Sequence, residues 1–215
     1  RIQTPTLTLD GEISADGIST PDWYRAGSSG GSVLIEVTTL NGSGTGSITA
    51  DGMPNTGSYY RHGSGGGGRI ALYYETDNWG ISGEVGDGLH AYGGSKYGYN
   101  GGPGTIYIEE TDVQDEHKGS LYFDNRSAVS AYSYTQNIEA SEYYFHNVYF
   151  GENVKTRIFG DTSQDSGVLM RLTGDFTLES GAIIEGGLTG YSPTGGQGFG
   201  ESGVGISGGG GAGHG

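Results

Sequence analysis

The chain of 215 residues carries 25 acidic and 10 basic side chains, and its net charge of −15 argues against nucleic acid and anionic membranes as partners. Glycine supplies 46 residues and apolar types only 33%, yet 16 Tyr, 6 Phe and 2 Trp can bury area that a disordered chain lacks. Cysteine is absent, and no stretch approaches the ~18 apolar residues of a membrane-spanning helix. The composition predicts a folded β protein with long glycine-rich connections.

The chain begins with two short segments in which apolar and polar residues alternate. They cover residues 6–9 and 12–15, and an Asp-Gly pair follows each of them. This pattern predicts a strand, a turn and a second strand. A tight hairpin is one interpretation, and a corner between two faces of a coil is the other. The recurrence of the pattern further along the chain favours the corner.

The same two landmarks recur along the first half of the chain. Glycine tracts lead into apolar segments that contain Val33, Ile70 and Ile106, which are 37 and 36 residues apart. The motif Glu-Ile-Ser-Ala-Asp-Gly at 12–17 returns as Ser-Ile-Thr-Ala-Asp-Gly at 47–52, and in degraded form at 88–93. Self-similarity at such a period indicates a repeat architecture in which each copy is one supersecondary unit.

These repeats predict parallel stacking of strands without helices, which is a β-solenoid. Glycine at this density costs roughly 1 kcal/mol per helical position, and we find no helical apolar stripe. Equivalent residues of successive copies then lie one strand spacing apart, ~4.8 Å. The predicted inward ladders are the following: Ile13, Ile48 and Leu89, and beside them Ala15, Ala50 and Ala91.

The chain divides by composition into three parts. Residues 1–110 are predicted to form glycine-rich β-helix layers. Residues 111–187 have fewer glycines and more aromatics, and we interpret them as a continuation of the β-helix or as a separate subdomain. Within them, residues 147–151 and 175–179 are similar at an offset of 28, and further strands are expected at 143–145, 158–159 and 168–170. Residues 188–215 form a glycine-rich terminal tract.

The end of the chain repeats its beginning. Residues 176–187 are similar to residues 7–17, and a glycine tract follows them. Elsewhere such a tract leads into a strand, and the strand that would come next resembles residues 1–3. The end of one copy therefore prepares for the beginning of another. Since the chain opens on Arg1 rather than Met, we expect it to be processed or cut from a longer protein.

The motifs Leu-Thr-Leu-Asp-Gly (7–11), Ile-Ser-Ala-Asp-Gly (13–17), Gly-Gly-Gly-Gly-Arg-Ile-Ala-Leu (65–72) and Gly-Gly-Gly-Gly-Ala-Gly-His-Gly (208–215) carry a family resemblance. The chain resembles the glycine-rich repeat regions of large bacterial surface and secreted proteins, adhesin-like or autotransporter-like. The resemblance covers roughly residues 1–110 and 176–215. It implies an all-β, right-handed parallel β-helix outside the cell, and it brings no catalytic residues.

Two aspartates are candidates for a metal site. Asp16 and Asp51 fall on successive copies of the motif, so their carboxylates are expected ~5 Å apart, where they repel each other. Either each one caps its own turn by accepting backbone N–H groups, or the two bridge a calcium ion. No other cofactor is expected. Looser candidates for the same ion are Asp112, Asp115, Glu116, Asp161 and Asp165.

A tyrosine cluster is the candidate ligand site. Tyr92, Tyr97 and Tyr99 lie beside a glycine tract, where exposed rings would stack on the sugars of an extracellular polysaccharide. The alternative is that these rings cover glycine backbone. Two glycine-rich matches carry no enzyme signal, since the Gly-x-Ser-x-Gly at 27–31 lacks a following helix and the Gly-x-Gly-x-x-Gly at 63–68 precedes a strand.

Three functions follow from these patterns. The first is a non-enzymatic extracellular structural protein that pairs strands head to tail, in a fibre or in a tandem surface array. The second is an adhesin segment or carbohydrate-binding module, and the third is a polysaccharide lyase or hydrolase. For the first, the predicted contact residues are Arg1, Ile2, Thr6, Leu7 and Leu9 at one end and Phe176, Leu178, Ile183 and Ile184 at the other.

Overall fold

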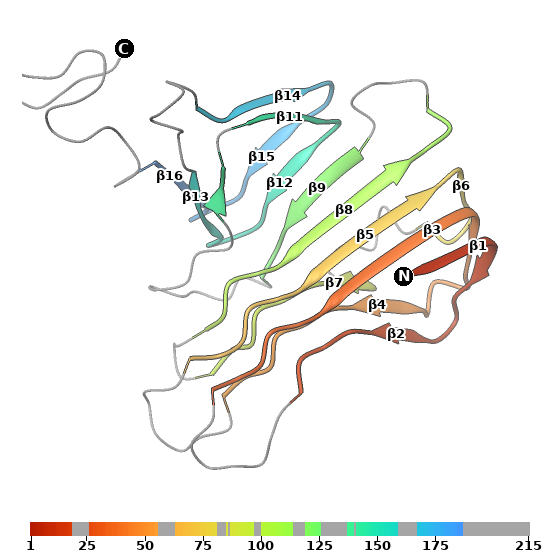
Figure 1. Ribbon diagram of the computed structural model, residues 1–215, viewed down its shortest axis with the longest axis horizontal. Coiled ribbons are helices and arrows are strands. Elements are labelled where there is room, and N and C mark those ends of the chain that lie inside the picture. The colour runs from red at the N-terminus through yellow and green to blue at the C-terminus, as the bar shows by residue number, and fades with distance from the viewer. Residues whose placement is uncertain are drawn as a thin grey trace, which may run out of the picture.

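The computed structural model describes residues 1–18, 26–55, 63–80, 85, 87–96, 100–113, 119–125, 137–139, 141–158 and 167–186. Over these ranges the chain is all-β, with mostly parallel strands in several sheets and no helix (Figure 1). The strands fall into a first block, β1 to β8, and a second block, β9 to β16. Outside the described residues lie Tyr97, Tyr99, Asp115, Glu116, Asp161, Asp165 and residues 187–215, which include the whole terminal tract 188–215.

The first block builds two parallel sheets. Its strands are β1 (Ile2–Thr8), β2 (Glu12–Ser14), β3 (Ser32–Asn41), β4 (Ser47–Thr49), β5 (Arg69–Tyr74), β6 (Thr76–Asp77), β7 (Leu89–His90) and β8 (Thr105–Glu110). One sheet has the order β1-β3-β5-β8, with β6 also paired to β3, and the other has the order β2-β4-β7. Because β1 pairs with β3 and β2 with β4, the Asp-Gly turn between β1 and β2 is a corner and not a hairpin.

The register of the first block confirms the spacing predicted from the repeats. Ile13 pairs with Ile48, and Ile48 with Leu89. In the other sheet Val33 pairs with Ile70, and Ile70 with Ile106. The predicted alanine ladder lies inside as well, since Ala50 and Ala91 are buried and Ala15 packs against the same core.

The second block repeats at the shorter offset. Its strands are β9 (Gly119–Phe123), β10 (Asn137–Ile138), β11 (Glu142–Phe145), β12 (Val148–Phe150), β13 (Lys155–Ile158), β14 (Leu169–Leu172), β15 (Phe176–Leu178) and β16 (Ile183–Glu185). The pairs β9-β12-β15, β10-β13-β16 and β11-β14 are all parallel. Val148 pairs with Phe176, which confirms the offset of 28 residues.

The chain reverses direction between the two blocks. Strand β9 pairs with β8 in antiparallel orientation, so one sheet, hereafter the long sheet, runs through both blocks in the order β1-β3-β5-β8-β9-β12-β15, with β6 beside β3 as its eighth strand (Figure 1). The prediction of a plain continuation after residue 110 missed this reversal. Gly119 fits the tight junction because a Cβ there would overlap the ring of Tyr107.

The reversal places the two hydrophobic cores on opposite faces of the long sheet. Tyr122 lies opposite Ile106 and packs against the first core, whereas its neighbours Leu121 and Phe123 point to the other face and belong to the second. The first core contains Leu9, Val33, Ile35, Val37, Leu40, Ile48, Ala50, Ile70, Leu72, Tyr74, Trp79, Leu89, Ala91, Ile106 and Ile108. The second contains Phe123, Ile138, Val148, Phe150 and Val154.

Glycine tracts join the two sheets of the first block through close backbone contacts. The glycine before each long strand donates its N–H to the alanine carbonyl of the motif, from Gly31 to Ala15 at 2.6 Å and from Gly68 to Ala50 at 2.6 Å. A Cβ on Gly67 would overlap the carbonyl oxygen of Ala91. A side chain has no space at such positions, which explains why the tracts are glycine.

We expect Gly67→Ala to lower the free energy of unfolding by at least ~2 kcal/mol, because the added methyl meets backbone that cannot move aside. The matched control is Gly63→Ala in the same tract, where an added Cβ meets no atom within 4 Å. Urea unfolding followed by circular dichroism measures both variants. Equal stability of the two would show that the tract is not packed as described.

Candidate functional site

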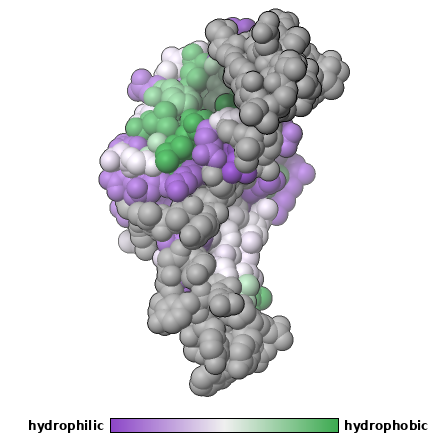
Figure 2. All heavy atoms as spheres, turned by 90° about the vertical axis from the view of Figure 1, so that its left-hand side faces the viewer, coloured by the Kyte–Doolittle hydropathy of each residue, from purple (hydrophilic) through white to green (hydrophobic). Residues whose placement is uncertain are grey.

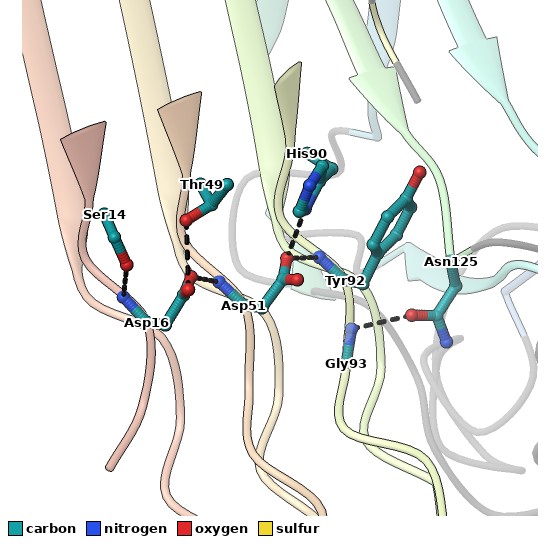
Figure 3. A network of polar contacts seen from close by, with 8 residues as sticks. All are labelled: Ser14, Asp16, Thr49, Asp51, His90, Tyr92, Gly93 and Asn125. Atoms are coloured by element: carbon teal, nitrogen blue, oxygen red, sulfur yellow. Dashed lines mark hydrogen bonds and ion pairs between the residues drawn. The ribbon is translucent and has the colours of Figure 1, made fainter. Parts of the chain in front are cut away.

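The two candidate aspartates form a ladder between successive repeats (Figure 3). Asp16 lies just after β2, and its carboxylate accepts the backbone N–H of Asp51 at 2.6 Å and the hydroxyl of Thr49 at 3.0 Å. The carboxylate of Asp51 in turn accepts the backbone N–H of Tyr92 at 2.7 Å and contacts Nδ1 of His90 at 2.9 Å. Each carboxylate therefore binds the next repeat, so the expectation that it caps its own turn is corrected.

The ladder ends on a residue that the sequence did not indicate. Asn125, buried just after β9, accepts the N–H of Gly93 at 2.7 Å and donates to the carbonyl of Gly101 at 3.1 Å (Figure 3). Its amide thus provides hydrogen-bond partners for a backbone N–H and a backbone carbonyl in the last layer of the first block. Only the position of Asp124 and Asn125 directly after a strand, like the Asp-Gly pairs, could have signalled it.

The aspartate ladder offers hydrogen-bond acceptors rather than an assembled cation cage. Among the described residues no group of three or more His, Asp or Glu is placed to hold a metal ion. Asp112 is described but belongs to no such group. Calcium binding by Asp16 and Asp51 therefore stays a prediction, and the oxygens it would use already accept backbone and side-chain donors.

The tyrosine cluster is only partly within the described residues. Tyr92 is 7% exposed, and its ring stacks on His90 with the centroids 4.7 Å apart. Such burial fits the alternative that the ring covers backbone, and it leaves little of Tyr92 for a sugar. Tyr97 and Tyr99 lie outside the described residues, so their part of the glycan hypothesis stays a prediction.

Another tyrosine pair lies on the face of the long sheet opposite the first core. The rings of Tyr73 and Tyr107 are 5.6 Å apart, and the Tyr107 hydroxyl donates to Glu109 at 2.7 Å. Burial, then that hydrogen bond, raises the pKa of Tyr107 well above its usual range. A groove of about 510 Å³ crosses this face and is lined by Gln3, Thr4, Pro5, Glu36, Val37, Thr38, Tyr73 and Thr111. Sequence reasoning missed this groove.

A second depression, of about 320 Å³, opens between the second core and the first block. Its walls are Arg69, Thr105, Leu121, Phe123, Ile138, Tyr143, Phe145 and Met170. It exists because the core changes faces at the β8–β9 junction, so its lining comes from both blocks.

The end of the second block leaves apolar side chains uncovered. Phe176 and Leu178 on β15 are 44% and 45% exposed, whereas Val148 and Phe150, at the same register positions on β12, are 0% exposed. Figure 2, which faces this end of the molecule, shows an apolar area bordered by hydrophilic residues. The core of the second block thus ends without a covering layer among the described residues.

The other predicted contact residues are on β16 and on or beside β1, and their role in a contact stays a prediction. On β16, Ile183 is exposed on the outer side and Ile184 packs against the second core. At the opposite edge, on β1, Ile2 and Leu7 are half-buried and Thr6 is exposed, while Leu9, just after the strand, is buried. Arg1 pairs with Glu36 at 2.6 Å. Strands β1 and β15 are thus the outer strands of the long sheet, and β16 is an outer strand of the separate β10-β13-β16 sheet.

Comparisons with protein-family models, with curated proteins and with solved structures found no match to this chain. The described part of the chain contains no helix of the length and apolarity needed to cross a membrane.

We expect Asp51→Ala to destabilise the protein by ~1–3 kcal/mol, because the N–H of Tyr92 and the side chain of His90 lose their acceptor. Asp51→Asn keeps one acceptor oxygen and should lose less. Thermal unfolding with and without added calcium separates the two roles of the carboxylate. A calcium-dependent rise in melting temperature that Asp51→Ala abolishes would contradict the hydrogen-bonding role and favour the ion.

The free energy of unfolding should fall in a defined window of alkaline pH. Burial, with the charges of Asp77 and Glu110, raises the pKa of Tyr74 to about 12 from its ordinary value of 10.0. The unfolded chain therefore releases this proton first, and the contribution of Tyr74 to stability, present below pH 10, is lost as the pH rises toward 12. Urea unfolding at a series of pH values measures the loss, which Tyr74→Phe should make less steep.

Proposed function

We propose that this protein is a non-enzymatic extracellular structural protein, a right-handed parallel β-helix that associates with further copies head to tail. The association takes place by strand pairing between the end at β15 and β16 and the end at β1 and β2. The copies are separate chains in a fibre or consecutive units of a tandem surface array. Parallel strands in register across three or more repeats support the β-helix part of the proposal.

One observation carries the proposal: no described residue forms a further layer over the last strand of the second core. Val148 and Phe150 are covered by the next strand, and Phe176 and Leu178, which continue the same columns, are nearly half exposed. Fully burying a side chain of this size stabilises a protein by roughly 1.5–3 kcal/mol. Burial of Phe176 and Leu178 under a further layer of apolar residues would therefore be favourable by a comparable free energy.

The edge strands supply the second part of the contact. Strands β1 and β15 are the outer members of the long sheet, and each has one side on which no described strand pairs with it. Such edges are templates for pairing with another chain. A contact that joins two different edges does not close on itself, and it produces a filament or an array.

A carbohydrate-binding role is the second candidate, and the groove over the long sheet favours it. Tyr73 lies in this groove between Glu36 and Glu109 in the register of the sheet, and it has an aromatic neighbour in Tyr107. An aromatic ring flanked by carboxylates suits a neutral sugar. Glycan-array binding that Tyr73→Ala removes would support this role.

We expect the purified protein to self-associate with increasing concentration, and the double variant Phe176→Ser, Leu178→Ser to stay monomeric. The variant is folded but its open column is polar, so burial by a second copy no longer stabilises the contact. Sedimentation velocity measures association, and electron microscopy looks for filaments with a repeat of ~4.8 Å along the axis.

The control is Val113→Ser, which changes an exposed apolar side chain just after β8, a middle strand of the long sheet, and should associate like the unmodified protein. Deletion of residues 1–9 should also leave a folded, unassembled protein. A monodisperse unmodified protein at all concentrations, or unchanged association after either edge is altered, would overturn the proposal.

A further inference from the structure

The reversal between the blocks fixes how a second copy can dock. Strand β15 runs opposite to β1, because the long sheet changes from parallel to antiparallel once, at β8 and β9. The two cores also lie on opposite faces of this sheet. The two ends of one molecule therefore differ both in the direction of the edge strand and in the face of the long sheet on which the core lies.

A second copy placed by translation alone would make a poor contact. Its β1 would pair with β15 in antiparallel orientation, and its first core would lie on the face away from Phe176 and Leu178. On the face where these two side chains lie, translation would bring Gln3 and Glu36, which face away from the first core. A polar surface there would leave the open column without apolar partners.

Rotation by half a turn about the axis along which the strands stack corrects both mismatches. It reverses β1, so that β1 runs parallel to β15, and it moves the first core to the face of the second. We infer that neighbouring copies are related by about half a turn, with β15 pairing in parallel with the next copy's β1 and Phe176 beside Leu7. This inference rests on the proposed head-to-tail association, for which it supplies orientation and register.

The register comes from the similarity between the two ends. Residues 176–186 match residues 7–17 at a constant offset of 169, which sets Leu178 beside Leu9. Further along, Ala182 comes to lie beside Ile13, and Ile184 beside Ala15. Ala182 and Ile184 pack against the second core, and Ile13 and Ala15 against the first. A small residue thus meets a large one at both positions, whereas within the first block Ile13 pairs with Ile48.

The same register continues the carboxylate ladder. Glu185 takes the place of Asp16. Its carboxylate accepts from Arg157 of its own chain at 3.2 Å, and in the inferred register it would also accept the N–H of the next copy's Asp16, as Asp16 accepts that of Asp51. Among the described residues of one copy, the N–H of Asp16 donates to the hydroxyl of Ser14 at 3.2 Å. In the inferred contact, as within the first block, the carboxylate of one layer accepts the backbone N–H of the following layer.

Engineered disulfides test the orientation, because the chain has no cysteine of its own. Thr8 and Thr177 lie between the core positions of their strands and point outward, and the inferred register puts them opposite each other. Neighbouring residues of paired strands are close enough for a disulfide. Mixing Thr8→Cys protein with Thr177→Cys protein under oxidation should give a cross-linked dimer that neither variant gives alone. The double variant should give a series of multimers on a non-reducing gel.

The control replaces Thr8→Cys by Gln3→Cys, which is exposed on the same strand but five residues away, ~16 Å. Mixed with Thr177→Cys it should not cross-link, and cross-linking there instead would overturn the register. Cross-linking of Thr177→Cys to itself would show a two-fold pairing of β15 edges and would also overturn the inference.

Sedimentation of the unmodified protein separates this inference from the function on which it rests. Association without a Thr8–Thr177 cross-link, with circular dichroism unchanged in the variants, refutes the half turn and keeps the proposed function. Absence of association refutes both. Cross-linking in the mixture alone supports both.

Discussion

The fold of the first block depends on short hydrogen bonds between glycine tracts and the alanines of the repeated motif. Gly31, Gly68 and Gly104 donate to the carbonyls of Ala15, Ala50 and Ala91 at 2.6, 2.6 and 2.7 Å. No strand of one sheet pairs with a strand of the other, so these bonds connect the two sheets directly. They need glycine on one side for close approach and a small side chain on the other. The two features that recur in the sequence, the glycine tracts and the alanine-containing motif, are thus the donor and the acceptor of the same hydrogen bonds.

Much of the first block could be predicted because the sequence spacing of the repeated motifs determines which residues pair between its strands. Ile13, Ile48 and Leu89 occupy equal positions of the motif, and the structure pairs them in that order. Spacing alone says which residues become neighbours, but it contains no information on chain direction. The antiparallel joint at Gly119 therefore could not be read from periods of 36 and 28 residues, and neither could the change of face that follows from it.

For the candidate sites, too, the sequence predicts which residues are neighbours but not the contacts that their side chains make. The proximity of Asp16 and Asp51 follows from the repeat, whereas the acceptance of the next repeat's N–H depends on the rotamer of each carboxylate. The burial of Tyr92 depends on His90 beneath it, and the role of Asn125 depends on the reversal. Exposure of Phe176 and Leu178 could not be inferred from their similarity to Leu7 and Leu9, because only the number of layers decides which copy is outermost.

The antiparallel joint has a consequence for how such a molecule can change its length. Strand β9 closes the first core at β8, with Tyr122 continuing its packing and Asn125 satisfying its last backbone groups. The segment from one glycine tract to the next is a self-contained module, since it adds one strand to each sheet of the first block. Duplication or loss of one module would lengthen or shorten the body by a single strand spacing. Both outer edges and the joint would be left intact, so size could vary during evolution without a change at either end of the sheet.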